Sequence, residues 1–193
     1  MGGNRGRAAA TAIAVGALLA LAAPAVASGD RTVLVSDACD PATFNDPANI
    51  SPQPPGGICQ RSDGNEGRRV TFAEFAARVM QKGFHNAWNF DRDHVTLRVG
   101  DVLTAVHGRG GELHTFTQVD QFGPGCIPFL NGGQPPPALC DVDVVDGTGL
   151  PLLAFQTAVV PGGPAQTFTA ASSGTFFFQC LIHPWMRTTV TVR

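Results

Sequence analysis

Three side chains that bind soft or borderline metal ions lie within seven positions near the C-terminus. They are Cys180, His183 and Met186, in the stretch CLIHPWM. Thiolate and thioether are soft ligands, and imidazole also suits copper. Pro184 interrupts strand pairing and the alternating segment TTVTV follows soon after it, so the stretch is predicted to form a turn between two strands. Because such a turn folds back on itself, we expect the three donors to converge on one centre.

The cysteine count supports a special role for Cys180. The chain has five cysteines, so one is left over if the others form disulfides. Cys39 and Cys59 flank one loop rich in Pro, Gly and Asn, and Cys126 and Cys140 flank another. Four cysteines allow three connectivities, but local pairs across these loops are the expected disulfides. Cys180 then remains a free thiol. The alternative to a metal-binding role is that Cys180 is simply a small buried hydrophobic residue.

A fourth ligand is expected from a strand upstream of this turn. Blue copper centres combine one Cys, two His and a weak axial Met, so a second histidine is required. His114 is the candidate, on the core face of the predicted strand LHTFTQV. His107 lies nearby in the sequence and is considered as a supporting residue behind a ligand, whereas His85 and His94 are expected to face solvent.

At these residues the sequence resembles the cupredoxins. The segment CLIHPWMRTTVTV is similar to the short C-terminal ligand loop of amicyanin-type members. The segment VTLRVGDVLTAVHGRGGELHTFTQV resembles their strand, Gly-Asp turn, strand and first histidine ligand. The resemblance implies that His114, Cys180, His183 and Met186 hold one type 1 copper ion per chain. It also implies that electrons leave through His183. Because the turn joins two strands and lies at one end of the sandwich, we expect a solvent-facing edge of the His183 ring, with a docking patch formed by Leu181, Ile182, Pro184 and Trp185.

The N-terminus has the pattern of an export signal. A basic start is followed by an apolar, Ala- and Leu-rich run over 8–22, and Ala25 and Ala27 form an A-x-A cleavage pattern. The apolar run is shorter than the roughly 20 residues that a membrane-spanning helix needs. We therefore interpret 1–27 as a signal peptide and expect a periplasmic or extracellular protein, with no membrane insertion of the mature chain.

The composition indicates which kind of fold and which kinds of partner to expect. The net charge is −2 and no basic run occurs, which argues against nucleic acid as a partner. With 23 Gly and 15 Pro in 193 residues, short strands and many turns are favoured over long helices. One helix is predicted between Thr71 and Gly83, where Thr71 and Glu74 form a capping box. Alternating segments predict eight or nine short strands, among them 94–99, 102–107 and 141–145.

The sequence therefore predicts an all-β, Greek-key, cupredoxin-like β-sandwich or barrel with one short extra helix near the N-terminus. The expected organisation is a signal peptide (1–27), an N-terminal extension with a disulfide loop and the helix (28–84), and a copper-binding domain (85–193). The expected function is that of an exported monomeric electron carrier whose partner is a redox protein of unknown identity. Copper trafficking or storage is the alternative. An enzyme is not expected, because five histidines without a His-x-His pair do not suit a multicopper oxidase.

Overall fold

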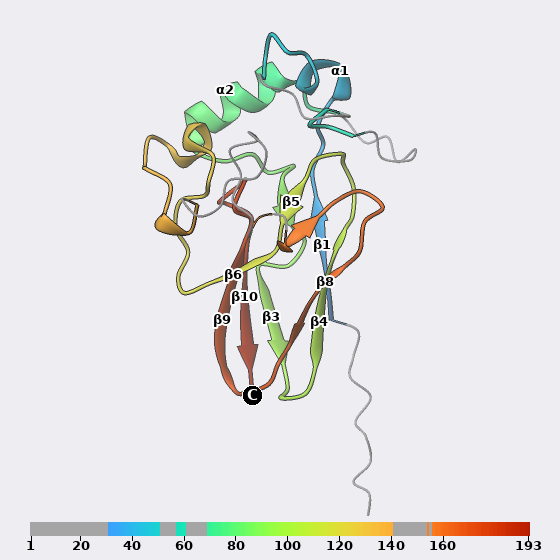
Figure 1. Cartoon of the computed structure of the whole chain (residues 1–193), viewed down its shortest axis with the longest axis vertical. Helices are drawn as coiled ribbons and strands as arrows, with labels where there is room; N and C mark the ends of the chain where they lie inside the picture. The colour runs from blue at the N-terminus through green and yellow to red at the C-terminus, as the bar shows by residue number, and fades with distance from the viewer. Residues whose placement is uncertain (1–30, 51–56, 61–68, 141–153, 155) are drawn as a thin grey trace, which may run out of the picture.

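The computed structural model describes residues 31–50, 57–60, 69–140, 154 and 156–193. Two mixed four-stranded sheets face each other, and two helices lie beyond one end of them (Figure 1). The predicted all-β sandwich is confirmed. The predicted signal peptide and the predicted strand at 141–145 lie outside the described residues.

The first sheet has the order β2-β1-β4-β8. Its central pair, β1 and β4, is parallel, and the two outer strands pair antiparallel to their neighbours. The strands are β1 (Arg31–Ser36), β2 (Asn89–Phe90), β4 (Val102–His107) and β8 (Gln166–Thr169). Because β1 is central in this sheet, the range 28–84 contributes a core strand as well as helices.

The second sheet has the order β3-β10-β9-β6. Its strands are β3 (His94–Leu97), β6 (Thr117–Val119), β9 (Gly174–Gln179) and β10 (Arg187–Val192). A separate two-stranded pair joins β5 (His114–Thr115) to β7 (Ala158–Val159). The antiparallel β9 and β10 are connected by the stretch that carries Cys180, His183 and Met186, so the predicted turn between two strands is confirmed.

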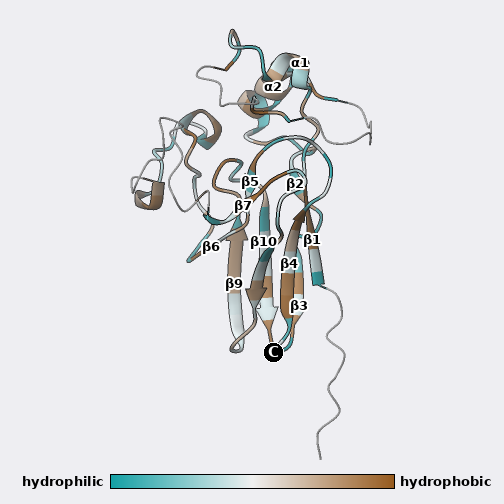
Figure 2. Cartoon of the chain, turned by 45° about the vertical axis from the view of Figure 1, so that its right-hand side comes forward, coloured by the Kyte–Doolittle hydropathy of each residue, from teal (hydrophilic) through white to brown (hydrophobic). Residues whose placement is uncertain are grey.

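Alternation along the strands places the core between the sheets. The strands carry both hydrophobic and hydrophilic residues (Figure 2). In β3, Val95 and Leu97 are buried while His94 and Thr96 are exposed. Val99 was expected on the same face as Val95, but β3 ends at Leu97 and Val99 is 53% exposed. The strand ends there because the Asp101 carboxylate accepts a hydrogen bond from the Arg98 backbone N–H (2.8 Å) and closes the turn.

The predicted helix is present as α2 (Phe72–Lys82). Thr71 and Glu74 form the reciprocal capping box, and Gly83 ends the helix at a φ of 79°. A second helix, α1 (Pro41–Phe44), was not predicted, because a single turn after an Asp40 N-cap is too short to show a helical period. Two short 3-10 helices were also not predicted, η1 (Pro128–Asn131) and η2 (Ala138–Cys140). None of the described helices is long and apolar enough to cross a membrane.

Four aromatic side chains, Phe44, Phe72, Phe75 and Trp88, pack together where α1 and α2 meet the sandwich, and we call them the aromatic cap. The rings of Phe75 and Trp88 lie 4.6 Å apart between centroids, and those of Phe44 and Trp88 lie 5.7 Å apart. The cap joins the main hydrophobic core of the sandwich. The segments that carry the helices are thus packed onto one end of the fold.

Both predicted disulfides are present in the structure, Cys39–Cys59 and Cys126–Cys140. The first links the start of the helical segment to residues 57–60, which lie beside the chain at Gly111 and Glu112. The second closes the loop that contains η1. Cys180 is the free cysteine and it is fully buried.

Candidate metal centre

The turn between β9 and β10 is closed by its own backbone. Cys180 donates its N–H to the Met186 carbonyl (3.0 Å), and Met186 donates its N–H to the His183 carbonyl (2.9 Å). The relative exposure of all three residues is 2% or less. The thiol, the imidazole and the thioether of this turn are therefore all buried in the protein interior.

His114 reaches the same place from β5. The donor atoms of His114, Cys180 and His183 all lie within 4.8 Å of one another. The distance from Cys180 Sγ to His183 Nδ1 is 3.9 Å, and the centroids of the two imidazole rings are 5.1 Å apart. Bonds to a first-row metal ion are about 2.0 Å to imidazole and about 2.3 Å to thiolate, so donors at this separation can share one ion.

One buried atom at the site has no partner within the protein. His114 Nδ1 is buried and makes no hydrogen bond. Buried polar atoms are normally satisfied, so an orphan nitrogen beside a thiol and a second imidazole is the observation that best fits a bound metal ion. The donor set of Cys180, His114 and His183, with Met186 in the same turn, fits copper.

The Cys180 sulfur is surrounded by donors. The backbone N–H groups of Thr115 and His183 each approach Sγ at 3.4 Å. Burial alone would raise the pKa of this thiol, but the neighbouring imidazoles of His114 and His183 lower it well below its ordinary value. The site therefore favours a thiolate, which is the form that binds a metal ion.

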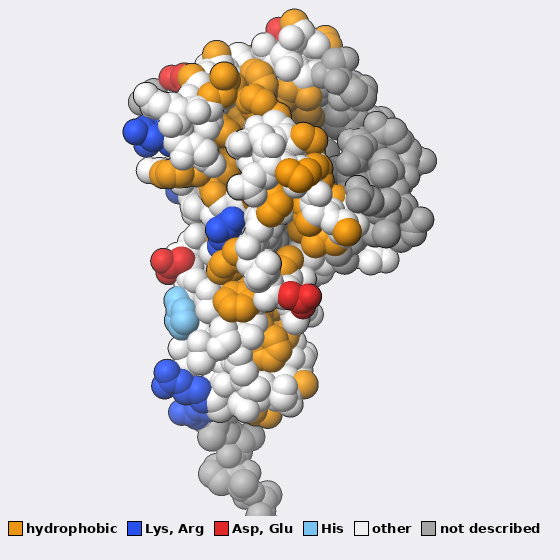
Figure 3. Space-filling view, turned by 90° about the vertical axis from the view of Figure 1, so that its left-hand side faces the viewer, with side chains coloured by type: hydrophobic (Ala, Val, Ile, Leu, Met, Phe, Trp, Pro, Cys, Tyr) orange, Lys and Arg blue, Asp and Glu red, His pale blue; other side chains and the backbone are white. Residues whose placement is uncertain are grey.

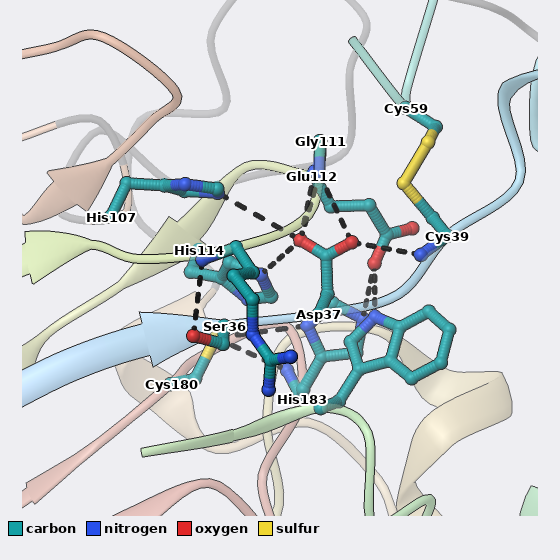
Figure 4. Close-up of polar contacts among 12 residues, drawn as sticks. Ser36, Asp37, Cys39, Cys59, His107, Gly111, Glu112, His114, Cys180 and His183 are labelled. Atoms are coloured by element: carbon teal, nitrogen blue, oxygen red, sulfur yellow. Dashed lines mark hydrogen bonds and ion pairs between the residues drawn. A yellow bond between two sulfur atoms is a disulfide. The ribbon is translucent and has the colours of Figure 1, made fainter. Parts of the chain in front are cut away.

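The outer nitrogen of His114 is held by Asp37. Asp37 Oδ2 lies 3.0 Å from His114 Nε2, and both side chains are fully buried (Figure 4). Burial opposes the imidazolium form of His114, but Asp37 and Cys180 outweigh it and raise the pKa to about 10. Burial likewise opposes ionised Asp37, yet His107 and His114 hold the pKa of its carboxyl far below the ordinary value. Asp37 thus directs Nε2 outward and leaves Nδ1 facing the thiol.

The outer nitrogen of His183 also faces a buried carboxylate. Glu112 Oε2 lies 3.4 Å from His183 Nε2 and accepts a hydrogen bond from the indole N–H of Trp88. Burial raises the pKa of Glu112 to about 6, with His183 acting in the opposite direction. Each histidine of the site is therefore backed by its own acid.

His107 is placed behind the site, in the supporting position that the sequence had left open. Its Nε2 lies 3.8 Å from Asp37 Oδ2, the oxygen that also contacts His114. Asp37, His107 and His114 are close enough to hold an ion by themselves. However, the Asp37 carboxylate already accepts backbone N–H groups from Cys39, Gly111 and Glu112, which is the environment of a stabilised anion and not of a cation site.

The expectation of a solvent-facing His183 edge is wrong. His183 is only 2% exposed, because its ring lies against Phe75 and Trp88 of the aromatic cap and against Trp185. Hydrophobic side chains gather on the upper part of the molecule, where the helices lie (Figure 3). Phe75 of α2 and Trp88 therefore cover the ring of His183.

The four residues of the predicted docking patch are less exposed than expected. Leu181 and Pro184 are buried, and only Ile182 and Trp185 are half-buried. Leu181 is covered because its carbonyl accepts the Cys126 N–H at 2.6 Å, and Gly125 approaches the same carbonyl so closely that a Cβ there would lie 2.4 Å from it. The loop closed by Cys126–Cys140 therefore packs directly on the ligand turn.

Sequence reasoning did not identify Asp37 and Glu112. Asp37 directly follows β1 and lies 77 residues before His114, so no local spacing connects them. Glu112 is two residues before the proposed ligand His114 in GGELH, and this proximity was the signal in the sequence that could have identified it. His85 was expected in solvent, but it is half-buried against Phe75 and Trp88, whereas His94 is exposed as predicted.

No family model and no curated protein matches the chain. Similar solved structures include a purple cupredoxin from Nitrosopumilus maritimus, with 10% identity, a TM-score of 0.40, and coverage of 85% of this chain and 100% of that one. An oxidised plastocyanin from Dryopteris crassirhizoma has 19% identity and a TM-score of 0.35 over 55% of this chain and 89% of its own. A mutant amicyanin in its Cu(I) form has 20% identity and a TM-score of 0.29 over 54% and 73%. The strand pairing of this chain by itself describes a β-sandwich of two mixed sheets, with the turn between β9 and β10 at one end.

Proposed function

We propose that this chain is an exported mononuclear blue copper protein that carries single electrons. One observation supports it above the others: the free thiol of Cys180 meets two imidazoles inside a buried site, with the donor atoms within 4.8 Å of one another. Bound copper supplies a one-electron couple between Cu(I) and Cu(II). The residues that would hold it are His114, Cys180 and His183, with Met186 as a weak axial ligand.

The surroundings of these residues suit a carrier. His114 is fixed in a strand by Asp37, and the ligand turn is closed by two backbone hydrogen bonds. The donor atoms of the ligands are therefore in place before a metal ion binds. They need to move little when the ion changes its oxidation state. Two N–H groups directed at Sγ stabilise the thiolate in either state. Four protein ligands leave no open position for a substrate, which is why we propose a carrier and not an enzyme.

Export and the partner are part of this proposal. Two disulfides are consistent with an oxidising compartment, and the pattern at 1–27 would direct the chain there. We infer that the chain acts as a monomer with a redox protein as its partner. Ile182 and Trp185 are the half-buried members of the ligand turn, and the Trp185 ring lies 5.5 Å from that of His183. This pair would form the shortest route from the site to a partner.

Copper storage is a second candidate, and the burial of His183 favours it. A histidine that is 2% exposed cannot be contacted directly by a partner, and a covered site retains its ion. The two functions differ in kinetics. A carrier shows a reversible midpoint potential and fast electron self-exchange, whereas a storage protein shows slow exchange even when it holds copper tightly.

The test of the copper site compares matched cysteine and histidine variants. Purified protein loaded with Cu(II) should bind one copper per chain and show a strong thiolate-to-copper band in the visible spectrum. Cys180→Ala and His114→Ala should lose this band. His94→Ala is the control, because His94 is exposed on β3 and should leave the spectrum unchanged. A visible band that survives Cys180→Ala would refute the site.

A further inference from the structure

Both histidines of the site place their outer nitrogen against a buried carboxylate. His114 Nε2 lies 3.0 Å from Asp37, and His183 Nε2 lies 3.4 Å from Glu112. Asp37 and Glu112 are each 4% exposed. The two acids come from different segments, Asp37 directly after β1 and Glu112 two residues before β5. Each of the two imidazoles beside the thiol therefore has one buried acid next to it. The two acids place negative charge close to the site.

The protein is built to keep Asp37 ionised. Its carboxylate accepts N–H groups from Cys39 (2.9 Å), Gly111 (3.1 Å) and Glu112 (3.0 Å). A side chain at Gly110 would collide with this carboxylate, since a Cβ there would lie 2.1 Å from Asp37 Cγ. The backbone at Gly110 also has a φ of 105°, which suits glycine. The chain thus wraps closely around one buried anion.

Glu112 is held in a different way. Its carboxylate accepts the Trp88 indole N–H, and Trp88 is 1% exposed within the aromatic cap. Residue 112 also pairs with Cys59 in an isolated bridge, and Cys59 is joined to Cys39 by the disulfide, as Figure 4 shows. The Cys39–Cys59 disulfide therefore connects the segments that hold Asp37 and Glu112, in addition to the contacts that these acids make at the site.

Within the described residues, the cationic partners of these two acids are histidines. Two of those histidines, His114 and His183, would be neutral ligands once they bind a metal ion through Nδ1. The buried negative charges then number three: the Cys180 thiolate and the two carboxylates. Buried anions need nearby positive charge, and a divalent ion balances three of them better than a monovalent ion does.

We propose that Asp37 and Glu112 are positioning residues that set the oxidation-state preference of the site, favouring Cu(II) over Cu(I) and lowering the reduction potential. They act through the imidazoles that they hold and through their charge, and neither contacts the ion. This inference rests on the proposed copper site and adds a cause for its potential. Neutral groups of the same shape at 37 and 112 should therefore shift the balance toward Cu(I).

The experiment uses the copper-loaded protein and two isosteric variants, Asp37→Asn and Glu112→Gln. Midpoint potentials are measured by spectroelectrochemistry at pH 8, and the Cu(I) dissociation constant is measured separately by competition with a Cu(I) chelator. Asp120→Asn is the matched control, because Asp120 is exposed and the substitution removes the same charge at the surface. Glu112→Gln is the milder variant, since a glutamine can still accept the Trp88 indole N–H.

Each variant should lower the ratio of Cu(II) to Cu(I) affinity by tenfold or more, which for one electron corresponds to a rise in potential of about 59 mV. Asp120→Asn should change this ratio by less than twofold. If Glu112→Gln folds, binds copper and keeps the potential of the unmodified protein, the proposed role is refuted. If the unmodified protein binds no copper at all, the proposed function fails instead, so the two outcomes are distinguishable.

Discussion

Phe75 is the residue through which the aromatic cap covers the site, so its removal tests how the cap works. The side chain is 3% exposed, and its ring lies 4.6 Å from Trp88, 5.5 Å from Phe44 and 6.2 Å from His183 between centroids. Both Trp88 and Phe44 are themselves 1% exposed, so they are held on several sides and cannot easily collapse into the space left by Phe75→Ala. The expected loss in free energy of unfolding is about 4 kcal/mol, within the range of about 3–5 kcal/mol for such substitutions.

This loss should be visible in two independent assays. Urea unfolding of the metal-free protein should show a midpoint lower by about 2 M, taking an m-value of about 2 kcal/mol/M. Removal of copper by an excess of chelator should also be faster, because the cap must open for the ion to leave. If all Phe75 contacts are lost on opening, about 4 kcal/mol corresponds to an acceleration of up to about a thousandfold.

Met80→Ala on the same helix is the control. Met80 is 77% exposed, so its truncation should change the free energy of unfolding by less than about 0.5 kcal/mol and leave copper removal unaffected. Phe75→Leu gives a smaller perturbation, of about 1–2 kcal/mol, if Phe75→Ala does not fold. Copper removal that is equally fast with and without Phe75 would show that the cap does not retain the ion, and the reasoning from burial would be refuted.

Three further predictions follow from the site and its supports. Met186→Leu should retain copper and raise the potential, because an axial thioether bond is long and weak; loss of copper, measured by metal analysis, would contradict this. Trp185→Lys should slow electron self-exchange, measured by NMR line broadening, since Trp185 is the half-buried ring next to His183; an unchanged rate would exclude this route. Replacing Cys39 and Cys59 together by alanine should lower stability by about 3 kcal/mol in urea unfolding on a chain-entropy estimate, and an unchanged midpoint would count against it.

Local patterns in the sequence predicted much of the fold. The capping box of Thr71 and Glu74 with Gly83 defined α2 almost to the residue, because helix ends depend on nearby hydrogen bonds. Alternation predicted β3 and β4, and the odd cysteine count left Cys180 free, as it is in the structure. These features depend on residues that are close in sequence or on simple counting.

Contacts between distant segments could not be predicted in the same way. Asp37 meets His114 across 77 residues, and nothing in either neighbourhood indicates the pair. The exposure of His183 was expected because its turn joins two strands at one end of the sandwich, but Phe75 of α2 and Trp88 lie against its ring. A two-residue strand such as β2 is likewise defined by its partner β1 and not by a pattern of its own.

The placement of Asp37 and Cys180 at opposite ends of the chain has a consequence for maturation. Asp37 follows the first strand, whereas Cys180 and His183 precede the last, so the ligand sphere and its supports come together only after β10 has joined the sheet. While the chain is being synthesised, it therefore lacks the complete set of side chains that could bind an ion. Under the proposed function, we expect copper to enter a protein that is already folded and whose cap is already packed over His183. We expect the rate of loading to be set by brief openings of that cap and not by diffusion of the metal ion.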